Sequence, residues 1–221
     1  MTYDKLVFGI CFYNDPSIFR LLDSIPKEYE KIIIDGKFKL NPNGKELSDE
    51  SLREKVLKYP NVILIDAPNL SEPDKRQKYL TDNKHKYLLI IDSDEYVKYA
   101  DWDKFYQFIE TLESGIHHVF FEVDANCGIS TYPRLWVNPS EWEYSLCHNI
   151  FKNDKLGLIL KSGFSEGKTI PGLLCGMGDE LRSKSYLKDT YDYQVEMIKY
   201  ELPFRHAYRD GDMTPFSKEI V

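Results

Sequence analysis

Two aspartates that directly follow an apolar run are the residues of this chain best suited to do chemistry. Residues 87–91 are predicted to form a buried β-strand, and Asp92 and Asp94 come immediately after it. Side chains two residues apart on a strand point to the same side, so both carboxylates converge at the strand's carboxyl end. Ligands of open α/β sheets bind at that edge, and paired carboxylates suit Mg²⁺ or Mn²⁺. The structural alternative is an acidic turn in which Asp94 caps a helix.

Length, charge and cysteine content restrict the class of protein. The 221 residues suffice for one α/β domain, and 42% hydrophobic with 14% aromatic residues indicates a folded chain. The net charge of −7 argues against a nucleic-acid partner, because such proteins need a basic surface. Four scattered cysteines without a Cys-x-x-Cys pair indicate free thiols in a reducing compartment. No signal-peptide layout or membrane-spanning run is visible, so a soluble, cytoplasmic protein is expected.

Strands and helices alternate along the first 125 residues, which places the aspartate pair at the end of a sheet strand. Strands are expected at 6–12, 31–34, 61–66, 87–91 and 118–123. Helices are expected at 16–25, 48–59, 74–83 and 102–112, the first of them with Asp15 as its N-cap. This alternation predicts an α/β fold with a mostly parallel central sheet flanked by helices.

The pattern becomes less regular after about residue 125. Short strands are expected near 135–136, 148–151 and 157–160, followed by a Gly-rich stretch over 163–178 and a helix over 180–200. Because the chain shows no internal repeat, linker or low-complexity block, we expect a single domain.

Five segments in a fixed order carry a resemblance to a known family. They are Phe8-Gly-Ile-Cys-Phe-Tyr-Asn-Asp15, Ile32-Ile-Ile-Asp35-Gly36, Ile90-Ile-Asp-Ser-Asp-Glu95, Pro133-Arg-Leu-Trp136 and Gly176-Met-Gly-Asp-Glu-Leu-Arg182. Together they resemble family 2 glycosyltransferases, which have the nucleotide-diphospho-sugar transferase (GT-A) fold. In the last segment a glycine stands where that family usually has a glutamate. The resemblance implies one Rossmann-like GT-A domain, with residues 1–125 as the nucleotide-sugar half and 126–221 as the acceptor half, including a C-terminal helix and tail.

The resemblance also implies a reaction and a donor site. The expected enzyme is a metal-dependent, inverting glycosyltransferase that uses a nucleoside-diphosphate sugar, UDP-sugars being favoured. Mn²⁺ or Mg²⁺, held by Asp92 and Asp94 with His206 as a third candidate ligand, would offset the charge of the departing diphosphate. For His206, a tail residue without function is the alternative. The implied donor-binding residues are Tyr13, Asn14, Asp15, Asp35, Lys75, Arg76, Asp92 and Ser93.

The acceptor half would supply the general base and the acceptor-binding side chains. Asp179 is the first candidate for the base and Glu180 the second, although Asp179 could instead be the N-cap of the following helix. Trp136, Trp142 and His148 are candidates for binding the acceptor; packing in the core is the alternative for all three. A glycan or lipid-linked acceptor is expected, which allows a peripheral association with a membrane.

Two other functions remain open at the level of sequence. Phosphatases of the haloacid dehalogenase type also use an Asp-x-Asp motif after a strand, with Mg²⁺ and with the first aspartate as nucleophile. In those enzymes the motif normally ends the first strand, whereas here three strand–helix units precede it. The second alternative is a non-catalytic binding protein on the nucleotide-sugar fold, since the acidic segment near Asp179 lacks its usual glutamate.

Overall fold

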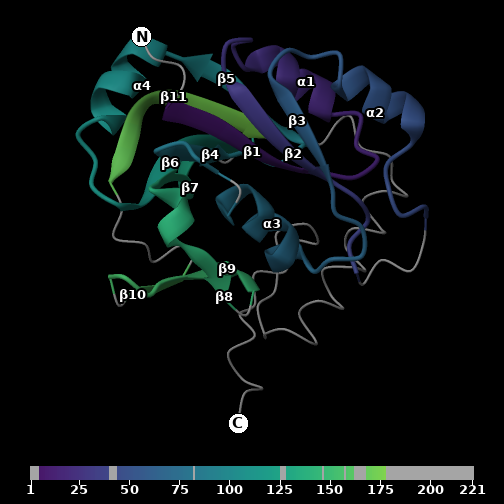
Figure 1. Cartoon of the computed structure of the whole chain (residues 1–221). Coiled ribbons are helices and arrows are strands. Elements are labelled where there is room, and N and C mark those ends of the chain that lie inside the picture. The colour runs from purple at the N-terminus through teal and green to yellow at the C-terminus, as the bar shows by residue number, and fades with distance from the viewer. Residues whose placement is uncertain are drawn as a thin grey trace.

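An eight-stranded sheet forms the centre of the structure, a computed structural model that describes residues 5–39, 44–81, 83–124, 128–145, 147–156, 158–161 and 168–177 (Figure 1). The strands lie in the order β3-β2-β1-β4-β7-β6-β11-β5. Their bounds are β1 (Leu6–Phe12), β2 (Glu30–Asp35), β3 (Val62–Asp66), β4 (Tyr87–Ile90), β5 (Glu95–Ala100), β6 (Gly115–Asp124), β7 (Gly128–Val137) and β11 (Thr169–Met177). The pairs β1–β2, β1–β4, β2–β3 and β6–β11 are parallel, whereas β4–β7, β6–β7 and β5–β11 are antiparallel. The prediction of an α/β fold with a mostly parallel central sheet is confirmed.

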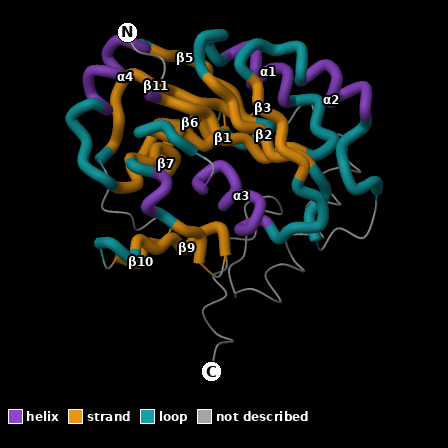
Figure 2. Tube along the Cα trace, in the orientation of Figure 1, coloured by secondary structure: helices purple, strands orange, loops and turns teal. Residues whose placement is uncertain are grey.

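The first four strands alternate with helices as predicted. Helices α1 (Ile18–Ser24), α2 (Glu50–Val56) and α3 (Glu72–Thr81) each follow one of the strands β1 to β3, and α4 (Trp102–Ile109) follows β5. Every residue of β1 and β4 is buried, because helices cover both faces of the sheet there. Figure 2 shows α1 and α2 on one side of these strands and α3 on the other.

Two strands of the central sheet were missed by the sequence analysis. Strand β5 carries charged and exposed residues on its outer side, and β11 lies in the stretch interpreted as Gly-rich. Strand β11 is placed between β6 and β5, with parallel bonds to the first and antiparallel bonds to the second. Such pairing partners are distant in sequence, so local patterns do not reveal them.

A small second sheet covers α3. It consists of β8 (Glu143–Ser145), β9 (Cys147–Asn153) and β10 (Leu158–Lys161), in the order β10-β9-β8. Helix α3 contacts β1 and β2 of the large sheet as well as β8 and β9 of the small one. In Figure 1 it therefore lies between the two sheets.

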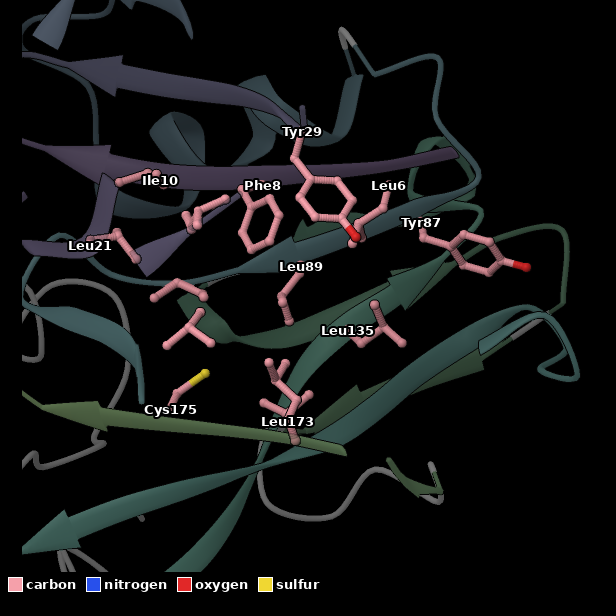
Figure 3. Close-up of a cluster of buried hydrophobic side chains, with 14 of the residues drawn as sticks. Leu6, Phe8, Ile10, Leu21, Tyr29, Tyr87, Leu89, Leu135, Leu173 and Cys175 are labelled. Carbon is pink, nitrogen blue, oxygen red and sulfur yellow. The ribbon is translucent and has the colours of Figure 1, made fainter. Parts of the chain in front are cut away.

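The large sheet separates two hydrophobic cores, and β1 contributes to both by alternation. Leu6, Phe8 and Ile10 point to the core shared with α1, α2 and α4, drawn in Figure 3, whereas Val7 and Cys11 point to the core beneath α3. The cysteines Cys11 and Cys175 are buried as free thiols, as expected.

Part of the sequence prediction falls outside the described residues. The helix expected over 180–200 and the tail with His206 lie there, and the division into halves at residue 125 stays a prediction. Within the described part of the chain, no helix is both long and apolar enough to pass through a bilayer.

The packing of Trp136 generates a prediction on stability. Its indole is 1% exposed and lies against Phe151, with ring centroids 4.7 Å apart, and against Trp142 and Tyr144. Replacing it by alanine would leave a cavity between the two sheets, so Trp136→Ala should lower the free energy of unfolding by about 3–5 kcal/mol. Urea denaturation measures this; Leu57→Ala, at a 56% exposed position, is the control and should change stability by less than about 0.5 kcal/mol. Equal losses in both variants would contradict this packing.

Candidate functional site

The predicted donor-site residues gather at one edge of the sheet. Strands β1, β2 and β4 are parallel neighbours, so the loops after their carboxyl ends lie side by side. One contact joins the loop after β1 to the loop after β4: the Ser93 hydroxyl donates to Asp15 at 2.6 Å. Just after β4, the Ile91 amide also donates to the Gly9 carbonyl within β1. The sequence analysis predicted a bound ligand at this same edge.

Asp15 holds both of these loops in position. Its Oδ1 accepts from the Ser17 amide at 2.9 Å just before α1, and its Oδ2 accepts from Ser93. The side chain is buried, so its two oxygens serve the protein rather than the surroundings. Asp15 and Ser93, both predicted to bind the donor, are thus brought together and fix the turn that carries Asp92 and Asp94.

Asp92 lies between two arginines. Arg76 of α3 reaches its Oδ1 at 2.8 Å, and Arg134 of β7 reaches its Oδ2 at 3.2 Å. Arg134 also bonds Glu95 at 2.8 Å, and Arg76 also bonds Glu72 at 2.9 Å. We call this chain of five alternating charges the arginine–carboxylate network.

The network fixes the protonation of its members. Burial alone would raise the pKa of Asp92, but the guanidiniums of Arg76 and Arg134 hold it well below its usual range, so Asp92 stays ionised. Burial raises the pKa of Glu95 to about 7, helped by the charge of Asp92 and opposed by Arg134. The Glu95 carboxyl group is therefore partly protonated at neutral pH.

The residues at this edge fit a divalent cation that is held by fewer protein ligands than the sequence predicted. Four acidic side chains (Glu72, Asp92, Asp94 and Glu95) accompany two guanidiniums, so the net charge here is −2 when Glu95 is ionised and −1 when it is protonated. In the described ranges, no group of three or more His, Cys, Asp or Glu side chains could hold a metal. Mg²⁺ and Mn²⁺ bind in this setting through one or two carboxylates together with phosphate oxygens of a substrate. The predicted third ligand, His206, lies outside the described residues.

Asp35 is placed differently from the role that the resemblance implied. Its carboxylate accepts from the amide and hydroxyl of Ser48 and forms an ion pair with Arg53, and the side chain is 0% exposed. Tyr13 and Asn14 are also engaged, because the Tyr13 hydroxyl donates to the Lys45 carbonyl and Asn14 bonds Ser48. In this structure Asp35 is not accessible to a nucleobase.

Lys75 and Arg76 are adjacent in sequence but serve different partners. The Lys75 amine is buried, donates to the Gly36 carbonyl and lies 4.1 Å from the ring centroid of Phe38. Burial lowers its pKa. Only Arg76 of the two therefore reaches the Asp92 turn.

The predicted acceptor residues Trp136 and Trp142 belong to the core. Each is 1% exposed, with ring centroids 6.1 Å apart, so neither presents a face on which a sugar could stack. The prediction that Trp136 and Trp142 bind the acceptor is therefore wrong. Packing both indoles inside the fold removes more apolar surface from water than leaving them at the surface would. His148 lies on β9, where its side chain is not described, and Asp179 and Glu180 lie outside the described residues.

The sequence analysis missed several residues of this edge. Arg134 stood in the quoted segment Pro133-Arg-Leu-Trp136 without a role, and Glu95 directly follows the aspartate pair. The sequence analysis assigned no role in the site to Ser48, Arg53 or Asp66, because the residues that they contact lie on separate elements.

Comparison with known proteins identifies the fold. No protein-family model matches the chain, and no curated protein sequence is significantly similar to it. A crystal structure of S. aureus TarS 1–349 matches 93% of this chain and 68% of its own, with 15% identity and a TM-score of 0.53. The complexes of the same protein with UDP and with UDP-GlcNAc match at TM-scores of 0.51 and 0.50 and identities of 15% and 13%, again over 93% of this chain and over 68% and 69% of theirs. The chain has the GT-A fold.

The extent of the match limits what it shows. At identities of 13–15% the likeness establishes the fold and not the activity. In the longer TarS structure the matched region makes up 41% of that chain, at a TM-score of 0.49.

The arginine–carboxylate network predicts an unequal effect of two changes at Arg134. Arg134→Met would leave Glu95 buried without its ion-pair partner and Asp92 with Arg76 alone, and it should lower the free energy of unfolding by about 3–5 kcal/mol. Arg134→Lys keeps the charge but cannot bridge both carboxylates, so a smaller loss is expected. Chemical denaturation at pH 7.5 tests this, with Lys152→Met as control, because its ion pair with Glu143 is exposed and worth less than about 1 kcal/mol. A neutral Arg134→Met variant would contradict the pairing.

Proposed function

We propose that this protein is a glycosyltransferase that uses a nucleoside-diphosphate sugar, with UDP-sugars favoured. One observation carries the proposal: the turn Asp92-Ser93-Asp94 lies at the carboxyl edge of a GT-A sheet, fixed by Asp15 and two arginines. TarS, a GT-A-type glycosyltransferase whose structures contain UDP and UDP-GlcNAc, provides the support for the donor class.

Charge balance supports the participation of Mn²⁺ or Mg²⁺. A site in which acidic groups outnumber guanidiniums would repel a diphosphate, and a divalent cation would compensate the charge of the site and of the diphosphate. Asp92, whose carboxylate is 28% exposed, and Asp94, which is 6% exposed, would hold the ion together with donor phosphate oxygens. When bound, such an ion neutralises charge on the departing diphosphate.

Asp92 would have a second task in donor binding. Its carboxylate is 28% exposed although each oxygen accepts from an arginine, so lone pairs remain for a hydroxyl group of the donor. Because the two guanidiniums keep Asp92 ionised, it acts as an acceptor of hydrogen bonds across the neutral pH range. The same contacts weigh against the phosphatase alternative, in which an aspartate oxygen must be exposed to attack phosphorus.

Acceptor and base belong to the second part of the chain. A glycan or lipid-linked acceptor and an inverting displacement are proposed from the resemblance alone. Asp179, with Glu180 as second candidate, would take the proton from the acceptor hydroxyl.

Donor binding can be tested without knowing the acceptor. Thermal-shift and calorimetric titrations with UDP, GDP, CMP and dTDP, each with Mn²⁺ or with EDTA, should show Mn²⁺-dependent binding of UDP. Ligand at 100 times its Kd would raise the free energy of unfolding by about 2.7 kcal/mol. Asp94→Asn should weaken UDP binding in Mn²⁺ by about tenfold or more, since even residues behind a metal ligand contribute that much.

Asp154→Asn, a change of the same charge at an exposed turn, is the control and should bind UDP as the wild type does. UDP affinity that EDTA leaves unchanged would contradict the cation. A wild-type protein that binds none of the four nucleotides, but is stabilised by Mg²⁺ with beryllofluoride, would replace the proposal by the phosphatase.

The base assignment predicts a kinetic effect without a binding effect. Asp179→Asn should lower the release of UDP from the donor sugar by about 100-fold, with UDP affinity changed less than about threefold. Steady-state assays combined with calorimetry measure both quantities. Loss of thermal stability with unchanged turnover would instead identify Asp179 as a helix cap.

A further inference from the structure

A histidine on β6 joins the start of β11 to the rest of the large sheet. The Nδ1 atom of His117 accepts from the Lys168 amide at 3.1 Å, and the His118 amide donates to the Lys168 carbonyl at 3.0 Å. Lys168 directly precedes β11, so these two bonds hold the beginning of that strand against β6. We call the pair His117 and Lys168 the latch.

The latch secures a strand end that the ladder itself holds by one residue pair. Thr169 pairs with His118, and the next pairs between the two strands begin at Leu174, opposite Phe120. The ladder is therefore interrupted over residues 170–173. Because the regular bonds resume only beyond this interruption, the contact at Lys168 decides whether the start of β11 stays on the sheet.

The hydrogen bonds of the latch require a neutral imidazole. A backbone amide can only donate, so Nδ1 of His117 carries a lone pair and no proton. The proton of the neutral ring is then on Nε2, which lies 3.3 Å from the Glu113 carbonyl and donates to it. Gly115 leaves room for the ring, since a Cβ there would lie 3.3 Å from Nε2. A second proton would have to go to Nδ1, where it would meet the Lys168 N–H and remove that bond.

The surroundings of the ring favour the neutral form. His117 is 7% exposed, and its partner across the ladder on β7 is the apolar Leu135. Burial is the main reason that the pKa of His117 lies below its ordinary value; the charges of Lys168 and His118 lower it further, and the bond to the Glu113 carbonyl opposes them. The ring is therefore neutral, and the latch is closed, at neutral pH.

The latch lies beside the point from which Arg134 reaches the candidate site. On β7, Leu135 pairs with His117 and Pro133 pairs with His118, so Arg134 is an extra residue between two consecutive pairs. Such a β-bulge changes the direction in which a side chain points, and a proline without an N–H is tolerated there. The strand segment that the latch holds is thus next to the bulge that directs Arg134 into the arginine–carboxylate network.

We propose that the latch is a pH-sensitive device: neutral His117 ties the start of β11 to β6, and protonation of its Nδ1 on acidification releases Lys168 and loosens this part of the sheet. The latch would act whatever donor the site binds. Because the unfolded chain takes up the proton more readily than the folded one, the stabilisation is complete above about pH 6.5 and is lost as the pH falls through the lower pKa of folded His117.

Amide hydrogen exchange followed by NMR tests the latch in the complete chain. In wild-type protein the protection factor of the Lys168 amide should fall by about tenfold or more between pH 7.5 and pH 5, as expected for the loss of one hydrogen bond. His117→Asn keeps an acceptor in place of Nδ1 but does not titrate, so its Lys168 amide should keep the same protection at both pH values to within about twofold. His118→Asn is the control: its bond to Lys168 comes from the backbone, so the pH dependence of the wild type should remain.

The tautomer of His117 provides a second measurement, which needs no variant. Nitrogen chemical shifts at pH 7.5 should show a protonated Nε2 and an unprotonated Nδ1. A proton on Nδ1 at this pH, or equal protection of the wild-type Lys168 amide at both pH values, would overturn the latch. It is also overturned if His117→Asn loses protection on acidification as the wild type does, or if His118→Asn abolishes the pH dependence, because another group would then be responsible.

Discussion

The pairing of Asp92 with two arginines is the interaction on which the candidate site depends. A largely enclosed carboxylate needs compensating charge, and here it comes from two separate elements, Arg76 on α3 and Arg134 on β7. Each arginine is held in turn by a glutamate, so removing either arginine leaves a buried glutamate without its ion-pair partner. The network therefore joins a helix, two strands and the Asp92 turn into one rigid edge, with an excess of negative charge directed at whatever binds there.

Helix α3 connects the arginine–carboxylate network to the small sheet, because it lies between the two sheets. Its buried residues include charged ones, Glu72 and Lys75, which a helix with one solvent-exposed face would keep at the surface. Each has a specific partner, and the Gln77 side chain accepts from the Tyr144 amide of β8 at 2.8 Å. The small sheet and its aromatic residues thus support the helix that carries Arg76, which gives Trp136 a structural connection to the site although it presents no surface there.

Two aspartates at this edge act through other residues rather than on a ligand. Asp15 orients Ser93, and Asp35 orients Ser48 and Arg53. Both are buried, whereas Asp66 is half exposed and Asp92 is partly exposed. Partners within the fold therefore distinguish carboxylates that look equivalent in the sequence: Asp15 and Asp35 position other residues, whereas Asp92 keeps exposed surface for a ligand.

The sequence by itself determined the alternation of β1 to β4 with α1 to α3 and the location of Asp92 and Asp94 at a strand end. Apolar runs and helix-start residues are local signals, and parallel strands bring their carboxyl ends together without further information. Only the tertiary structure decided that β11 inserts between β6 and β5, that Trp136 and Trp142 pack inside, and that Arg134 faces Asp92. These outcomes depend on contacts between residues far apart in the chain, where packing and charge compensation select partners that no local pattern specifies.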